Sequence, residues 1–98
     1  MSKTLIVTPE AEADLAEAYA WYQARRDGWG DRLILAVEAT MNQIRRVPSG
    51  GRELQSGVRQ LVTRQFPYAV IYRVDEDRIS VLAVYHTSRN PQGWQDRE

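Results

Sequence analysis

The sequence has no cysteine and a single histidine, His86. Without cysteine the chain can form neither a disulfide framework nor a thiolate zinc site, and one histidine excludes metal centres built from several histidines. No apolar run approaches the ~20 residues that a membrane-spanning helix needs, and the start of the chain lacks the layout of a secretory signal peptide. We therefore expect a cytoplasmic protein without metal, cofactor or membrane association.

Several motifs of common enzymes are missing as well. No GxxxxGK[ST] or GxGxxG motif follows an expected strand, and no GxSxG motif occurs, so phosphate-cradling loops and a serine nucleophile elbow are not evident. Thirteen basic residues balance thirteen acidic ones, which argues against binding nucleic acid mainly through an overall positive field. All basic residues except Lys3 are arginines, whose planar forks grip carboxylates and phosphates.

The length of 98 residues predicts one domain, residues 1–98, with a single small core. Residues 4–7 are short and β-branched, which favours a strand. Thr8 as a cap and Pro9 at the first helical position predict a helix that ends near Arg25 and Arg26. A second helix is expected from Gly30-Asp31, with Asp31 as its cap, to Val47-Pro48.

The remainder favours strands at residues 58–64, 67–74 and 79–86, joined by short polar turns into an antiparallel meander. Strict alternation along the last strand would place Leu82, Val84 and His86 on one face. The polar tail, residues 87–98, is expected to be loop or a short turn. The order βααβββ predicts an α+β fold in which a helical hairpin packs on a small antiparallel sheet.

Antiparallel pairing would gather chemically capable residues at one side of this sheet. They are Arg59, Arg64, Tyr72, Arg73, Tyr85, His86, Arg89 and Trp94. Arginines can hold a scissile phosphate, histidine can move a proton near neutral pH, and an indole can stack on a base. Each residue type also has an ordinary role, because strand arginines are often solvated or paired and a histidine at a strand end often serves only as a hydrogen-bonding group.

Six short motifs, taken in chain order, carry a resemblance to a known protein family. They are V-T-P-E-A-E-A-D-L at 7–15, I-R-R-V-P at 44–48, a near match to G-x-R-x-L at 51–54, V-R-Q-L-V at 58–62, Y-A-V-I-Y-R-V at 68–74 and V-x-x-V-Y-H-x-x-R-N-P-x-x-W at 81–94. Together they resemble the RelE/ParE superfamily of bacterial toxins over nearly the whole chain. The resemblance implies a toxin of a type II toxin–antitoxin pair, wrapped by an antitoxin that alone contacts operator DNA.

Two toxic activities occur on this fold, and the fold cannot choose between them. ParE-like members block DNA gyrase, and RelE-like members cut messenger RNA on the ribosome. The single lysine, the balanced charge and a tryptophan where RelE-like enzymes carry a tyrosine favour a ParE-like gyrase inhibitor that is not an enzyme. Its target-binding candidates are Arg59, Arg73, Tyr85, His86, Arg89 and Trp94.

The alternatives stay open at this point. Arg64 and Arg89 fall where RelE-like nucleases place active-site arginines, so Arg64, His86 and Arg89 are the catalytic candidates for a metal-independent endoribonuclease that meets messenger RNA on the ribosome. A third possibility is an interaction module without toxicity. For the antitoxin, an apolar groove between hairpin and sheet suits a partner helix. The candidate contacts are Trp21, which lies one position off the expected buried face of the first helix, and Trp29, which lies in the expected interhelix loop.

Overall fold

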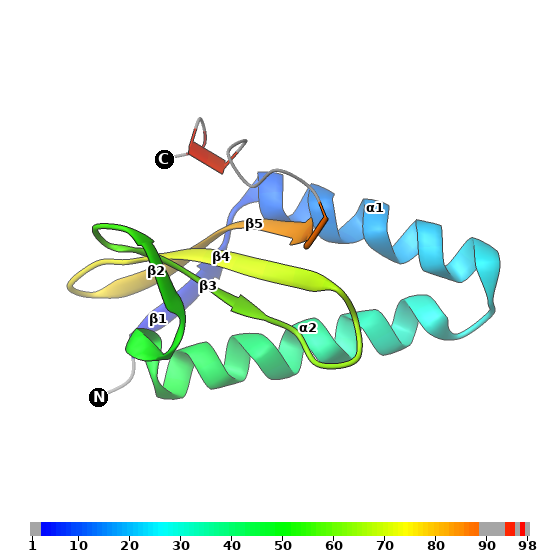
Figure 1. Ribbon diagram of the computed structural model, residues 1–98, viewed down its shortest axis with the longest axis horizontal. Helices are drawn as coiled ribbons and strands as arrows, with labels where there is room; N and C mark the ends of the chain where they lie inside the picture. The colour runs from blue at the N-terminus through cyan, green and yellow to red at the C-terminus, as the bar shows by residue number, and fades with distance from the viewer. Residues whose placement is uncertain (1–2, 89–93, 96, 98) are drawn as a thin grey trace.

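A two-layer arrangement of helices on a sheet characterises the computed structural model, which describes residues 3–88, 94–95 and 97. The elements are β1 (Thr4–Val7), α1 (Pro9–Arg25), α2 (Trp29–Arg46), a short 3₁₀ helix η1 (Pro48–Gly50), β2 (Arg52–Gln55), β3 (Val58–Val62), β4 (Tyr68–Val74) and β5 (Arg78–His86). The two helices form a hairpin that covers one face of the sheet (Figure 1). The predicted α+β fold class is confirmed.

α1 begins with the cap that the sequence predicts, whereas α2 does not. Thr8 caps α1 through its side-chain oxygen, which accepts a hydrogen bond from the backbone N–H of Ala11, as expected. The start of α2 has no cap from its own side chains, so the prediction that Asp31 caps it is wrong. Instead Gln23 of α1 accepts hydrogen bonds from the backbone N–H groups of Gly28 and Gly30. A cap that reaches across from the neighbouring helix cannot be seen in local sequence.

The sheet is mixed and has five strands in the order β1-β5-β4-β3-β2. β1 runs parallel to β5, whereas the other three pairings are antiparallel. The meander of β3, β4 and β5 agrees with the prediction, but the expectation of a purely antiparallel sheet is wrong. The prediction also missed β2, because its sequence RELQ is largely polar and exposed and lacks the β-branched signature of a strand.

A β-bulge in β5 breaks the alternation expected from the sequence. β4 pairs with Val81 and again with Ala83, which leaves Leu82 as an additional residue on the bulged strand. Val81 and Val84 consequently both face the helices, whereas Leu82 belongs to the opposite side. The expected grouping of Leu82 with Val84 is therefore wrong.

Each face of the sheet has its own buried cluster. The helix side holds the larger cluster, with members Ala11, Ala18, Leu33, Val37, Met41, Ile44, Phe66, Val70, Tyr72, Ile79, Val81 and Val84. The other side, which we call the open face because neither α1 nor α2 covers it, holds Val58, Ile71, Leu82, Ala83, Tyr85 and Trp94. Trp94 is only 3% exposed, so this tail residue closes the second cluster.

Candidate functional site

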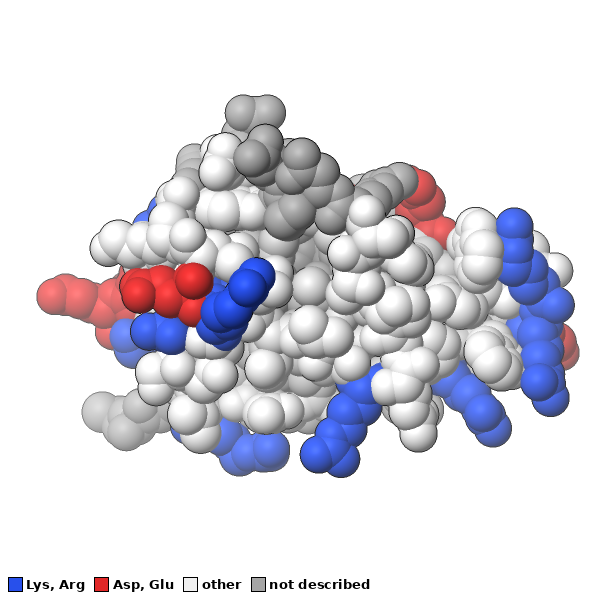
Figure 2. All heavy atoms as spheres, in the orientation of Figure 1, with Lys and Arg blue, Asp and Glu red and all other residues white. Residues whose placement is uncertain are grey.

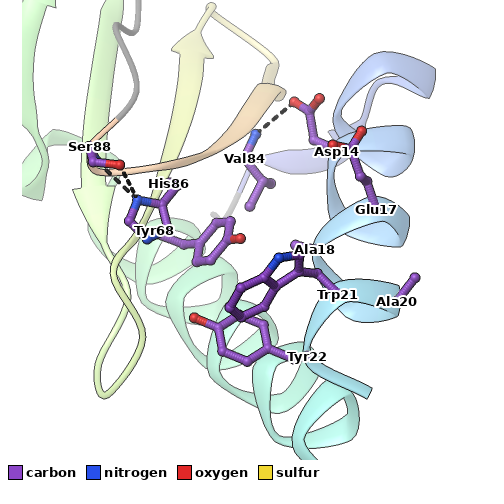
Figure 3. A pocket seen from close by; sticks show the side chains of 10 residues that line it. All are labelled: Asp14, Glu17, Ala18, Ala20, Trp21, Tyr22, Tyr68, Val84, His86 and Ser88. Carbon is purple, nitrogen blue, oxygen red and sulfur yellow. Dashed lines mark hydrogen bonds between the residues drawn. The ribbon is translucent and has the colours of Figure 1, made fainter. Parts of the chain in front are cut away.

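A groove runs between α1 and the outer edge of β5, and we call it the α1–β5 groove (Figure 3). Its volume is about 570 Å³, and its lining residues are Asp14, Glu17, Ala18, Ala20, Trp21, Tyr22, Tyr68, Val84, His86 and Ser88. Both charged side chains in this lining are acidic. The groove therefore combines an apolar, aromatic wall with negative charge.

The groove exposes part of a strand edge. β1 pairs with β5 only as far as Val81. Beyond that point Asp14 accepts a hydrogen bond from the Val84 N–H at 3.1 Å, and Arg97 donates to the Leu82 carbonyl at 3.1 Å and to Asp14 at 2.6 Å. The hydrogen bond to Asp14 raises the pKa of Arg97. Side chains thus cap the first positions of an edge that another strand could otherwise extend.

Aromatic rings form the far wall of the groove. Trp21 is 49% exposed, and the guanidinium of Arg25 lies 3.6 Å from the centre of its ring. Tyr22 makes edge contacts with both Trp21 and Tyr68, and the rings of all three point into the groove (Figure 3). A large, half-exposed indole beside a strand edge is typical of a protein-binding surface.

His86 lies at the end of the groove, where its ring packs edge-on against Tyr68 with centres 5.3 Å apart. Its Nδ1 accepts a hydrogen bond from the backbone N–H of Ser88 at 3.1 Å and lies 2.7 Å from the Ser88 hydroxyl. No arginine belongs to the described lining of this groove. The imidazole is therefore held by a local turn, without a neighbouring cation in the lining to bind a phosphate.

Arg64 lines a different groove, between α2 and β3, which we call the α2–β3 groove. Its volume is about 830 Å³, and its lining residues are Arg32, Leu35, Ala36, Ala39, Thr40, Gln43, Arg46, Val47, Val62, Arg64 and Gln65. The structure thus puts Arg64 and His86 in separate grooves. Figure 2 shows blue basic side chains along the lower border of the molecule, where Figure 1 draws α2, and red acidic ones near the β4–β5 turn at the left.

Arg59 has a structural role on the helix side of the sheet. Its guanidinium donates to the carbonyl oxygen of Gly51 at 2.7 Å and to that of Ser49 at 3.2 Å. Beside it the buried Tyr72 hydroxyl donates to the Pro48 carbonyl at 2.8 Å and accepts from the Gly51 N–H at 3.1 Å. Burial raises the pKa of Tyr72 even though the Gly51 hydrogen bond and the charge of Arg59 act in the opposite direction.

The other target-binding candidates lie on the open face, except Arg89, which lies outside the described residues. Arg73 is half-buried and pairs across the sheet with Val58, a member of the open-face cluster. Tyr85 and Trp94 are buried in that same cluster, so neither presents its ring to a target. Arg89 lies outside the described residues. The structure therefore does not gather the predicted residues into one exposed patch.

The two antitoxin candidates differ in their surroundings. Trp21 lines the α1–β5 groove, as described above. Trp29 is half-buried, packs against Tyr22 with ring centres 6.3 Å apart, and contacts Phe66 edge-on at 6.2 Å. Trp29 therefore helps to hold the hairpin on the β3–β4 turn, and only Trp21 offers a partner a substantial exposed surface.

The α2–β3 groove was not predicted from the sequence. A signal for it existed, because Leu35 falls outside the buried face of α2 defined by Leu33, Val37, Met41 and Ile44. Leu35 is 65% exposed, and an exposed aliphatic side chain indicates a partner surface only where other apolar side chains lie near it. Only the fold shows that Val62 of β3 lines the same groove.

No group of three or more histidine, cysteine, aspartate or glutamate residues in the described part of the chain could hold a metal ion. Likewise, no described helix is long and apolar enough to cross a membrane. The two grooves therefore remain the candidate sites.

Comparison with known proteins identifies the family of this chain. Residues 5–91 match the model of the family described as ParE toxin of type II toxin-antitoxin system, parDE. The chain is 35% identical over 92 residues to Toxin ParE2 of Mycobacterium tuberculosis, in strains CDC 1551 / Oshkosh and H37Rv alike, covering 93% of this chain and 88% of the relative.

A solved structure supports the fold. A chain from the chromosomal ParDE TA system from P. aeruginosa superposes with a TM-score of 0.66 at 24% identity, covering 87% of this chain and 96% of that one. At this identity the likeness concerns the fold alone. The family match and the mycobacterial relative show that this chain belongs to the family of ParE toxins of type II toxin–antitoxin systems.

Proposed function

We propose that this toxin acts in the cytoplasm by inhibiting DNA gyrase, and that a cognate antitoxin neutralises it. The observation that carries the proposal is the ParE family match over residues 5–91, because gyrase inhibition is the activity that the resemblance to ParE-like toxins implies. Inhibition of an enzyme by binding needs a recognition surface and no catalytic constellation.

The surroundings of His86 favour a binding toxin over a nuclease. Metal-free cleavage of RNA needs cations at the scissile phosphate beside the proton-transfer group. Arg64 lines the α2–β3 groove, whereas His86 lies in the α1–β5 groove without an arginine in its described lining. This separation supports gyrase over messenger RNA as the target.

The target-binding surface follows from accessibility. Of the candidates named from the sequence, Arg59 is engaged with backbone carbonyls, and Tyr85 and Trp94 are buried. His86 and Arg73 keep part of their surface accessible, and we therefore propose them as the residues to test first. Arg89 remains a candidate from the sequence alone.

We propose that one segment of the antitoxin binds in the α1–β5 groove. Its half-exposed Trp21 provides an anchor, and the adjoining edge of β5 offers backbone groups to an extended chain. Truncation of a well-placed indole at an interface costs about 2 kcal/mol or more in binding free energy. A Trp21→Ala variant should therefore bind the antitoxin at least roughly thirtyfold more weakly.

A supercoiling assay tests the target. Purified toxin is titrated into gyrase with relaxed plasmid and ATP, and we expect loss of supercoiling that is restored when the antitoxin is added first. A parallel arm adds the toxin to a reconstituted translation reaction and maps message ends by primer extension. Normal supercoiling at micromolar toxin, together with cleaved message, would overturn the gyrase proposal in favour of ribosome-dependent cleavage.

A further inference from the structure

The outer face of α1 carries more apolar surface than a helix facing solvent needs. One line of exposed residues on this face follows the helical repeat, and we call it the α1 stripe: Glu10, Ala13, Glu17, Ala20, Trp21 and Ala24. Glu17, Ala20 and Trp21 also line the α1–β5 groove (Figure 3). Trp21 is 49% exposed, and the alanines leave a smooth apolar surface beside it. Such a surface on the outside of a helix indicates a place where another element packs.

The α2–β3 groove also concentrates exposed apolar surface. Five large hydrophobic residues are exposed in the described part of the chain, and three of them, Leu35, Val47 and Val62, line this groove at 65, 54 and 50% exposure. The charged residues of its lining are Arg32, Arg46 and Arg64. None of the described lining residues is acidic. The groove therefore fits a helix that carries both an apolar stripe and carboxylates.

The α1 stripe and the part of the groove formed by α2 have the same spacing when one helix is read backwards. In the antiparallel register that aligns them, the opposed pairs are Ala24 and Arg32, Trp21 and Leu35, Ala20 and Ala36, Glu17 and Ala39, Ala13 and Gln43, and Glu10 and Arg46. Every member of the stripe thus meets a lining residue of the groove. From Arg32 to Arg46 the contact would extend about 21 Å at 1.5 Å per residue, or about four helical turns.

The opposed pairs are complementary in size. Trp21 and Leu35 are both large and exposed, and in this register the indole packs on the aliphatic side chain. Ala20 and Ala36 come next to them. Because both alanines are small, the two helix backbones can approach to about 8 Å there. The contact therefore removes from water the apolar surface that each helix exposes on its own.

The ends of the two helices are complementary in charge. Glu10 in the first turn of α1 meets Arg46 in the last turn of α2. At the other end, Arg25 in the last turn of α1 falls opposite Asp31 in the first turn of α2. Antiparallel packing also brings the positive end of each helix dipole to the negative end of the other. Parallel packing would instead oppose like charges at both ends, so charge selects the antiparallel direction.

We propose that the α1 stripe of one toxin molecule packs antiparallel in the α2–β3 groove of a second copy. The two surfaces lie along different helices of the hairpin (Figure 1), so a pair of copies still has one free stripe and one free groove. Such a heterologous contact adds copies head to tail, in a ring or an open chain. The antitoxin segment proposed for the α1–β5 groove also needs Trp21, so the contact belongs to the free toxin. One helix face on each side makes a small interface, and we expect a dissociation constant of about 10–100 μM.

Sedimentation velocity of the purified toxin measures the association. The average mass should rise with concentration across that range and fall at high salt, because salt screens the paired charges. Glu10→Arg and Arg46→Glu are the test variants. Each opposes like charges, and each should weaken the association about tenfold at low salt. An equimolar mixture of the two should associate like wild type, because every contact between unlike variants again joins opposite charges.

Glu12→Arg and Arg45→Glu are the matched controls. Glu12 lies in the first turn of α1, as Glu10 does, but outside the α1 stripe. Arg45 is exposed on α2 beside Arg46 but lies outside the groove lining. Each control should change the dissociation constant less than about twofold. All four positions are exposed, so thermal unfolding should show folded variants.

The lack of cysteine allows a direct test of the register. Ala20→Cys and Ala36→Cys variants are mixed under mildly oxidising conditions, and we expect a disulfide-linked heterodimer. In the proposed register the two Cβ atoms come within reach of a disulfide, about 3.5–4.5 Å. Ala13→Cys replaces Ala20→Cys in the control mixture. Because Ala13 lies two helical turns away, about 10.5 Å along the axis, this mixture should not cross-link.

Wild-type toxin that stays monomeric throughout the concentration range would overturn the proposal, and the groove would then belong to a different partner. Equal losses in the test and control variants would also overturn it, since they would indicate association through overall charge. A disulfide between two Ala36→Cys chains in preference to the mixed one would show that copies meet through α2 alone, against the proposal. The inference does not depend on the target: toxin that associates as expected but fails to inhibit gyrase would reject the gyrase proposal and leave this one standing.

Discussion

The buried hydroxyl of Tyr72 provides the sharpest test of the packing described above. Tyr72→Phe keeps the ring and removes one oxygen, which donates to the Pro48 carbonyl and accepts from the Gly51 N–H. The Tyr72 side chain is fully buried, so both backbone groups would lose a partner that water cannot easily replace. Leaving buried polar groups unsatisfied costs about 1–3 kcal/mol, and we expect a loss of about 2 kcal/mol in the free energy of unfolding.

Urea denaturation followed by circular dichroism measures this loss as a lower midpoint at an unchanged slope. In thermal unfolding it corresponds to a drop of about 8–16 °C for a domain of this size. Tyr19→Phe is the control, because Tyr19 is half-buried and its hydroxyl has no hydrogen-bond partner among the described residues. If Tyr72→Phe shifts the midpoint no more than the control does, the hydroxyl does not anchor the η1–β2 connection and the reasoning is wrong.

Three further predictions concern pH, an ion pair and the tail. Burial raises the pKa of Tyr72 in the folded state above its ordinary value of 10.0, so its contribution to stability is intact below pH 10 and is lost as pH rises further. Tyr72→Phe should therefore flatten the fall of stability that urea titration measures above pH 10. Asp14 and Arg97 are 14% and 21% exposed and lie 2.6 Å apart, so a double-mutant cycle of Asp14→Ala and Arg97→Ala should give a coupling of about 1 kcal/mol that shrinks in salt; additive losses would deny the pair any role. Trp94→Ala should cost about 3 kcal/mol and increase binding of a hydrophobic dye, because it opens the second cluster; unchanged unfolding and dye binding would show that the tail does not seal it.

Local chemistry explains why most elements were predictable. Thr8 and Pro9 mark the start of α1, the spacing of Leu33, Val37 and Ile44 marks the buried face of α2, and the β-branched runs mark β4 and β5. β2 was not predicted, because its residues pair through the backbone while their side chains are polar and largely exposed. The parallel pairing of β1 with β5 joins segments more than seventy residues apart, a distance at which no local pattern carries information.

The site was less predictable for the same reason. Chain order places Arg64, His86 and Arg89 near strand ends, but it does not say which helix each will face. In the structure Arg64 lines the groove beside α2, and His86 lines the groove beside α1. The bulge at Leu82 reverses the faces of the residues that follow, and Trp94 is buried in a cluster whose other members come from distant strands. The family resemblance predicted the fold and the class of protein better than local patterns did, because it compares the whole chain rather than single segments.

The pairing of β1 with β5 has a consequence for how the toxin comes into being. Translation makes β1 first and β5 after every other element, yet the two are immediate neighbours in the sheet. Throughout synthesis the opening strand has no mate, and α1 has no finished surface on which to settle. The sheet therefore cannot close over β1 until β5, the last strand of the described residues, has been made.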